Sequence, residues 1–230
     1  MTLRAGGCSE HPYEAFNIAD HVGDAPAAVT ANREHLTRCL PTEPLWLKQV
    51  HGTKTIAATA HPGTTSPEAD AIWTQNRDRV CAVMTADCLP ILVTDQEGTQ
   101  VAAIHAGWRG LAAGIIEEAL KPFQGRSARL LAWLGPCIGP KAFEVGTEVY
   151  RAFLDDDPEA EQAFQAQNSG RWMADLQHLA RIKMTRCRIS DIYADSSCTY
   201  SDHKRFYSFR RDGQTGRMAT LIWIAGPTTS

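Results

Sequence analysis

The chain has 230 residues, of which 43% are hydrophobic and 21% charged, so it is long enough to bury a sizeable core. Its net charge of −3 at pH 7, together with the lack of a basic patch interleaved with aromatic residues, argues against a nucleic-acid partner. Because the first 16 residues contain no apolar signal segment and no apolar run is long enough to span a bilayer, we expect a cytoplasmic protein that binds no membrane.

Taken in chain order, strand-like segments and amphipathic helices alternate in the middle of the chain, and paired strands occupy its ends. Strands are predicted at 45–50, 53–59, 70–74, 79–86, 90–95, 101–106, 128–135, 190–195, 205–212 and 217–225. Helices are predicted at 110–123, 146–156 and 175–187. This order predicts an α/β or α+β fold, with a single domain over 1–230 and a mixed β-sheet core packed by helices in sandwich-like layers.

Three residues that can bind a metal stand where an apolar strand is interrupted or ends: His51 in KQVHGT, Cys88 in TADCLP and His105 in AIHAGWRG. Because strand ends of a mixed sheet meet at one edge, we expect these side chains to lie close together. Two imidazoles and a thiolate suit Zn²⁺, and three protein ligands leave the fourth tetrahedral position open. Each residue taken alone is equally explained as a buried, hydrogen-bonded side chain, so the prediction rests on their coincidence.

Further motifs accompany these three residues: GGCSEHPY, ADHVGDAP, VTANR, ADAIWT, MTADCLPIL, IHAGWRGL, GPCIGPKAFEVG and YSFRRDGQTGRMA. Together they cover residues 4–224, and by them the chain resembles the laccase-domain family, whose members were once described as multicopper polyphenol oxidases. The resemblance implies a zinc-dependent purine nucleoside phosphorylase that acts on adenosine, inosine or methylthioadenosine and also deaminates adenosine. It also implies that the zinc ligands are His51, Cys88 and His105.

Deamination of adenosine requires hydroxide to attack the purine carbon that carries the amine, and bound zinc supplies such a nucleophile near neutral pH. A carboxylate is then needed to transfer the proton, and Asp87, adjacent to Cys88, is the candidate catalytic residue. It reaches the metal only if the chain turns at this point, because successive side chains of a strand point to opposite faces. The alternative is that Asp87 or Asp70 does not act on the substrate but hydrogen-bonds to a histidine ligand and orients it.

Phosphorolysis requires an anion site more than it requires a metal. Arg109 is the first candidate, because it stands at the start of a predicted helix, where backbone N–H groups also favour an anion. Arg4 and Arg210, or the adjacent Arg211, are further candidates for binding substrate or phosphate. An arginine in such a position more often forms a surface or structural salt bridge, and this alternative stands for each of them. Trp108 can stack on a purine, although an indole in this position is more often part of the core.

Three other functions remain open from the sequence. A copper-dependent polyphenol oxidase could use the same His-Cys-His set with Met84 as a weak axial ligand, but the chain contains no His-x-His pair for further coppers. A metal-free hydrolase or deamidase could use Cys88 as nucleophile and His105 as base. A role in editing cell-wall precursors is ascribed to some relatives. The chain lacks the glycine-rich motifs of dinucleotide and NTP sites, and the sequence gives no prediction of the oligomeric state.

Overall fold

A computed structural model of the protein describes residues 1–58, 66–124 and 129–226. Its centre is a six-stranded sheet in the order β1-β2-β5-β4-β6-β10. The strands are β1 (Thr55–Ala57), β2 (Ala71–Thr74), β4 (Leu89–Asp95), β5 (Val101–Ala106), β6 (Leu130–Leu134) and β10 (Asp191–Ala194). The two outer strands run parallel to their neighbours, whereas the inner four pair antiparallel. The predicted mixed sheet is therefore confirmed.

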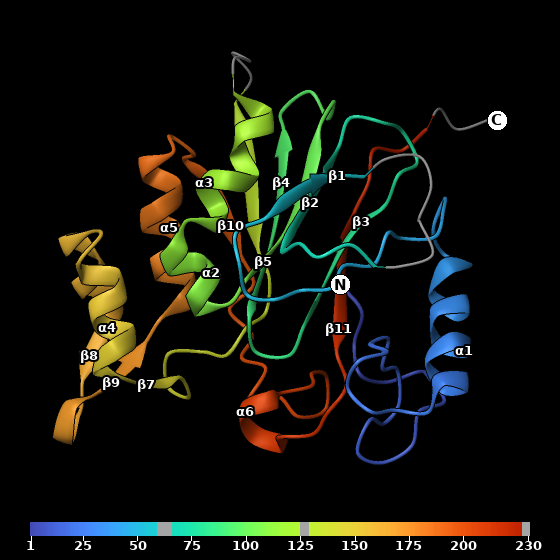
Figure 1. The fold of residues 1–230 in the computed structure, drawn as a ribbon, viewed down its shortest axis with the longest axis horizontal. Helices are drawn as coiled ribbons and strands as arrows, with labels where there is room; N and C mark the ends of the chain where they lie inside the picture. The colour runs from blue at the N-terminus through green and yellow to red at the C-terminus, as the bar shows by residue number, and fades with distance from the viewer. Residues whose placement is uncertain (59–65, 125–128, 227–230) are drawn as a thin grey trace.

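Side chains of the central sheet alternate between two apolar faces, as the two-residue period of a strand requires. On β5, Ala102 and Ile104 point to one face, and Val101 and Ala103 point to the other. The helices α2 (Trp108–Ala113), α3 (Ile115–Leu120) and α5 (Leu176–Arg186), with the 3₁₀ helix η1 (Lys121–Phe123), lie on the first face (Figure 1). His105 has the parity of the second face, so its side chain points away from these helices at the end of β5.

The second face is covered by an antiparallel ribbon of β3 (Cys81–Thr85) and β11 (Met218–Ile222). Cys81 and Val83 of this ribbon pack against the central sheet. Ala82 and Met84 point the other way and contact the N-terminal segment, including Ile18, and the region of α1 (Pro26–Thr37). Helices, sheet, ribbon and N-terminal segment thus form the predicted sandwich-like layers, and the single-domain organisation of 1–230 remains a prediction.

A smaller antiparallel sheet lies beside the helical layer, at the left of Figure 1. Its strands are β7 (Glu144–Gly146), β9 (Arg171–Ala174) and β8 (Phe164–Ala166), and α4 (Thr147–Leu154) packs with it, next to the 3₁₀ helices η2 (Pro158–Ala163) and η3 (Asn168–Gly170). The short helix α6 (Phe209–Asp212) lies at the edge of the central sheet where β5 ends (Figure 1). No helix among the described residues has both the length and the apolar character needed to cross a bilayer.

Two predicted elements differ from the structure for identifiable reasons. The strand predicted at 45–50 is wrong, because only Lys48 forms a bridge there, with Glu68. The helix predicted at 110–123 is broken at Gly114, whose φ of +96° ends α2 and begins α3. Glycine adopts this left-handed conformation at low cost, which explains why the chain can turn at that point without losing the apolar helix face.

The strand predicted at 205–212 is also wrong. Its second half forms α6, because the side-chain oxygen of Ser208 accepts a hydrogen bond from the backbone N–H of Arg211 and caps the helix. The helix α1 and the three strands of the smaller sheet were not predicted. The predicted strands 53–59 and 128–135 are shortened to β1 and β6, and their residues 59 and 128 lie outside the described residues.

Candidate metal centre and its cavity

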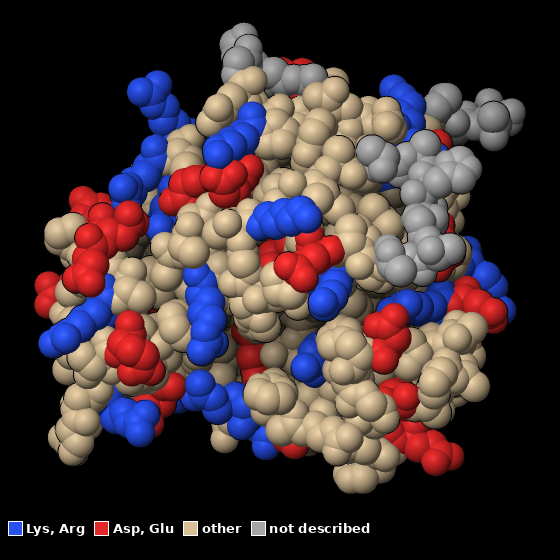
Figure 2. All heavy atoms as spheres, viewed as in Figure 1, with Lys and Arg blue, Asp and Glu red and all other residues tan. Residues whose placement is uncertain are grey.

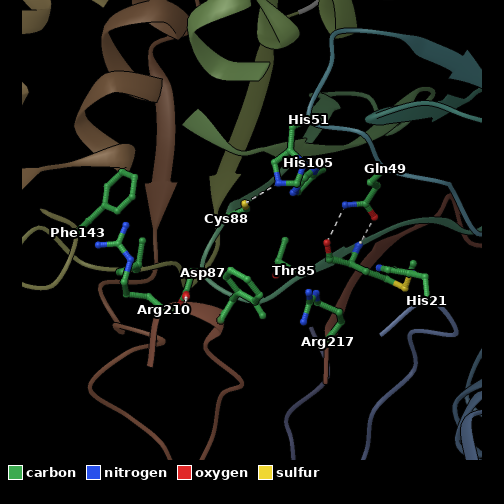
Figure 3. Close-up of a pocket in the computed structure, with 14 residues that line it drawn as sticks. His21, Gln49, His51, Thr85, Asp87, Cys88, His105, Phe143, Arg210 and Arg217 are labelled. Atoms are coloured by element: carbon green, nitrogen blue, oxygen red, sulfur yellow. Dashed lines mark hydrogen bonds between the residues drawn. The ribbon is translucent and has the colours of Figure 1, made fainter. Parts of the chain in front are cut away.

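The side chains of His51, Cys88 and His105 meet at one end of a cavity (Figure 3). The register of β4 and β5 pairs Pro90 with His105, so Cys88, directly before β4, lies diagonally across from His105, while His51 comes from the loop before β1. The potential ligand atoms of the three residues all lie within 4.8 Å of one another, and Cys88 Sγ lies 3.7 Å from His51 Nε2. Two nitrogens and a sulfur at this spacing can hold one metal ion.

Asp70, fully buried before β2, holds both histidines in place. Its Oδ1 accepts hydrogen bonds from His105 Nδ1 (2.8 Å) and from the backbone N–H of His51 (2.9 Å). Its Oδ2 accepts from the backbone N–H groups of Gly52 (2.8 Å) and Val50 (3.2 Å). Because a carboxylate only accepts, Nδ1 of His105 carries the proton, and Nε2 is left as the ligand atom. Although burial favours the neutral acid, these donors lower the pKa of Asp70.

The thiol of Cys88 is prepared for ionisation by its neighbours. Burial alone would raise the pKa of Cys88, but the positive charge of His105 and hydrogen bonds with both histidines lower it to about 6. Conversely, burial would lower the pKa of His105, but Cys88 and Asp70 raise it to about 9. Both shifts favour a thiolate–imidazolium pair of Cys88 and His105 in the protein without metal.

Two glycines of the motif HAGWRG allow the chain segments to approach this closely. A Cβ atom on Gly107 would lie 2.7 Å from His51 Cδ2 and 3.1 Å from Cys88 Sγ. A Cβ atom on Gly110 would lie 2.8 Å from the carbonyl oxygen of Gly52. Any side chain at these two positions would displace the loop that carries His51, so the glycines after His105 are part of how the centre is built.

Asp87 lines the cavity, but its carboxylate is already engaged by three donors. Thr199 Oγ1 donates to Oδ1 (2.6 Å), and Ser208 Oγ (3.0 Å) and the backbone N–H of Arg210 (2.6 Å) donate to Oδ2. The chain does turn here, with a φ of +89°, so that Asp87 faces α6 while Cys88 faces the histidines. This is the arrangement of a positioning residue, which ties the metal-binding turn to the segment 208–210.

The cavity next to the centre has a volume of about 360 Å³, within the range of small-molecule sites. Figure 3 shows Phe143 and Arg210 on one side and Arg217 and His21 on the other. Phe209 completes the wall and is 59% exposed. In Figure 2 a hollow opens in this region between the central sheet and α6, with lysine or arginine side chains at its border. The cavity therefore combines a metal centre, aromatic surface and positive charge.

The predicted arginines are placed differently from one another. Arg210 lines the cavity, where its Nη1 donates to the carbonyl oxygen of Glu144 (2.9 Å). Arg109 does not line it; its exposed guanidinium lies over the ring of Trp108, 4.3 Å from the centroid. Arg4 also lies outside, held by the carbonyl oxygens of Glu14 and His203. The anion-binding roles expected for Arg109 and Arg4 are therefore not supported by their positions.

Several residues of the cavity stand within the motifs of the family resemblance, but the sequence pattern alone assigned them no role. Arg217, His21 and Phe209 come from segments that look like ordinary loops or strand ends, and tertiary packing alone brings them together. Gln49 has a structural role at the cavity wall, because its side chain forms hydrogen bonds with both the backbone N–H (2.7 Å) and the carbonyl oxygen (2.8 Å) of Met84. These two hydrogen bonds hold the loop before His51 against β3.

Comparison with known proteins finds full-length matches to a family model and to bacterial proteins. Residues 1–225 match the family model described as multi-copper polyphenol oxidoreductase laccase. The chain is 46% identical over 225 residues to the purine nucleoside phosphorylase YfiH of Escherichia coli, covering 97% of this chain and 92% of that protein. It is 47% identical to a purine nucleoside phosphorylase of Pseudomonas aeruginosa, with the same coverage.

Solved structures agree with these matches. A Neisseria meningitidis protein superposes with a TM-score of 0.93 and 44% identity, covering 98% of this chain and 93% of that one. YlmD from Geobacillus stearothermophilus superposes with a TM-score of 0.91 and 30% identity, covering 98% and 90%. The fold and the full-length match agree, and the chain belongs to the multi-copper polyphenol oxidoreductase laccase family.

Proposed function

We propose that this protein is a purine nucleoside phosphorylase, which uses phosphate to cleave adenosine, inosine or methylthioadenosine into the base and the sugar 1-phosphate. The observation that carries the proposal is one cavity that joins a metal-binding triad to aromatic walls and two arginines. The names of the bacterial relatives, which match over 97% of the chain, support the same activity.

The residues of the centre fit Zn²⁺. His51 and His105 offer imidazole nitrogens, and the lowered pKa of Cys88 provides a thiolate at neutral pH. When bound there, the ion supplies a positive charge that polarises a substrate oxygen or a water molecule. Asp70 holds the proton of His105 on Nδ1, which keeps Nε2 directed at the centre.

The remaining cavity residues are proposed to bind the nucleoside. The exposed ring of Phe209 and the ring of Phe143 offer apolar surface for a purine. Arg210, held at its backbone by Asp87, places a guanidinium at the rim for an anionic oxygen. In the reaction, an oxygen of hydrogen phosphate forms a bond to the anomeric carbon while the glycosidic carbon–nitrogen bond breaks, and the proton of the hydrogen phosphate passes to the nitrogen of the departing base.

We further propose adenosine deaminase activity, in which water replaces the amine and ammonia leaves. Asp87 was the candidate for the proton transfer, and its three donors favour a positioning role instead. Asp87 holds the turn at Cys88 in a fixed position relative to the segment that carries Phe209 and Arg210.

The cytoplasmic location expected from the sequence remains a prediction.

Copper-dependent polyphenol oxidation is the second candidate, because the description of the matching family contains it. Among the described residues, His51, Cys88 and His105 form the one group of potential ligands close enough to hold a metal, whereas a multicopper oxidase needs several. A metal-free hydrolase is the third, because Cys88 and His105 already form an activated pair. Activity that survives chelation but is lost on alkylation would favour that third candidate.

The proposed function is tested by incubating the zinc-loaded protein with adenosine, with and without phosphate. Adenine and ribose 1-phosphate that appear only with phosphate support phosphorolysis, and inosine in either condition supports deamination. Metal analysis of the same preparation separates zinc from copper. Oxidation of a phenolic dye by a copper-containing preparation, without release of base, would contradict the proposal.

A further inference from the structure

The cavity holds a second guanidinium, Arg217, for which neither the sequence nor the relatives' names suggest a role. It stands directly before β11, on the opposite side of the cavity from Arg210 (Figure 3). Its backbone N–H donates to Asn17 Oδ1 (2.9 Å), and its Nη1 donates to the carbonyl oxygens of Thr215 (2.9 Å) and Gly216 (3.0 Å). These contacts fix both the base of the side chain and one edge of the guanidinium.

Among the described residues, the other donors of Arg217 have no hydrogen-bond acceptor. Within the described part of the chain, Nε and Nη2 donate no hydrogen bond and no carboxylate forms an ion pair with the guanidinium. The side chain is nevertheless half-buried, whereas Arg210 is exposed. A cation that is partly removed from water without a paired anion is costly to keep, so its place in the cavity requires an explanation.

The surroundings of Arg217 indicate what it pairs with. Burial lowers the pKa of its guanidinium, and the negative charges of Cys88 and Asp87 act in the opposite direction. Both of those charges are already engaged, one by the histidines and one by three donors. The guanidinium of Arg217 is fixed at Nη1, whereas its Nε and Nη2 nitrogens remain free to donate. These two nitrogens can bind a tetrahedral oxyanion with two parallel hydrogen bonds.

We propose that Arg217 is the principal binding residue for inorganic phosphate in this cavity, with Arg210 at the rim contributing less. The inference rests on the proposed phosphorolysis and names the group that holds its second substrate. Arg217 lies beside the Phe209 ring, with 5.8 Å from Cζ to the centroid, so phosphate bound to it would adjoin a purine nucleoside packed against that ring. The half-buried position strengthens the electrostatic attraction relative to that of the exposed Arg210.

Two measurements on the full-length, zinc-loaded protein test this inference. The first is the rise of Tm with increasing inorganic phosphate, which reports binding without any turnover. Wild type should be stabilised in a saturable manner, and Arg217→Gln should lose most of that response. The second is the KM for phosphate at fixed inosine, which should rise at least about tenfold in Arg217→Gln and less in Arg217→Lys and Arg210→Gln. Arg151→Gln, which removes an exposed charge on α4 outside the cavity, is the matched control and should behave as wild type.

The inosine KM separates binding of phosphate from a structural role. If Arg217 only stabilises its loop, the KM values of Arg217→Gln for inosine and for phosphate should rise together. This result would overturn the inference. An unchanged phosphate response in folded, zinc-containing Arg217→Gln overturns it as well. If phosphate stabilises wild type through Arg217 but no base is released, the inference stands and the proposed function fails. If base release requires phosphate but is insensitive to Arg217→Gln and Arg217→Lys, only the inference fails.

Discussion

Asp70 and His105 form a buried pair in which the carboxylate oxygen Oδ1 accepts a hydrogen bond from Nδ1 over 2.8 Å. The same oxygen also accepts the backbone N–H of His51, so one carboxylate fixes two of the three potential metal ligands. Metal affinity should therefore depend on a residue that cannot itself reach the ion.

We expect Asp70→Asn to weaken zinc binding about 10- to 100-fold, because loss of an outer hydrogen-bond partner has effects of this size. The measurement is competition with a chromophoric zinc chelator. Asp95→Asn is the control, since Asp95 is also buried but caps the far end of β4 through Thr99. It should lower stability and leave zinc affinity unchanged; equal affinities in wild type and Asp70→Asn would contradict the assigned role.

Gly107→Ala should destroy the metal centre, because its Cβ would lie 2.7 Å from His51 Cδ2. The zinc content of the purified variant, measured by mass spectrometry, should fall well below one ion per chain. Gly52→Ala is a matched control in the same centre: its Cβ would meet Asp70 Oδ2 at an ordinary 3.5 Å, and its N–H is retained. Zinc content preserved in Gly107→Ala would show that the loop of His51 can move aside.

In zinc-free protein, alkylation of Cys88 should follow a titration with a midpoint near pH 6, since only the thiolate reacts. The rate rises with pH through this midpoint and is constant above it, where an ordinary thiol would still be mostly protonated. His105→Gln should move the midpoint upward. The positive charge of His105, which lowers the pKa of the thiol, is then lost, whereas burial still raises that pKa. Site-resolved mass spectrometry after timed iodoacetamide treatment provides the rates. A midpoint near the ordinary thiol value of 9.0 would contradict the ion pair.

Asp87→Asn should raise the nucleoside KM about tenfold while zinc content stays the same. The amide replaces one acceptor oxygen with a donor, so it cannot satisfy Thr199, Ser208 and the Arg210 N–H together. The segment that carries Phe209 and Arg210 should therefore shift. Steady-state kinetics at saturating phosphate measure the effect. A large loss of deamination kcat at unchanged KM would instead favour proton transfer by Asp87.

Much of the central sheet was predictable because its strands obey local rules. Strands 70–74 and 101–106 are confirmed as β2 and β5, and helices 146–156 and 175–187 as α4 and α5. The prediction fails where a tertiary contact decides the conformation. At 205–212, the aromatic residues suggest a strand, but Ser208 caps a helix and also donates to Asp87, 121 residues earlier.

The residues of the candidate site, too, were predictable only in part. His51, Cys88 and His105 could be identified because each interrupts an apolar segment, and the structure brings them together. Arg109 was the natural anion candidate from its position at the start of a predicted helix, yet its exposed side chain lies over the ring of Trp108 and does not line the cavity. The sequence pattern assigned no role to Arg217, because its significance comes from half-burial and free donors, which no local pattern encodes.

The most direct test of the whole account is titration of chelator-treated protein with Zn²⁺ while phosphate-dependent release of base from inosine or adenosine is followed. Activity should be absent at first, rise linearly and saturate at about one equivalent, and Cys88→Ala, folded by circular dichroism, should neither bind the ion nor gain activity. Full base release by the metal-free protein, or by Cys88→Ala, would contradict the claim that His51, Cys88 and His105 form the metal centre of a phosphorylase.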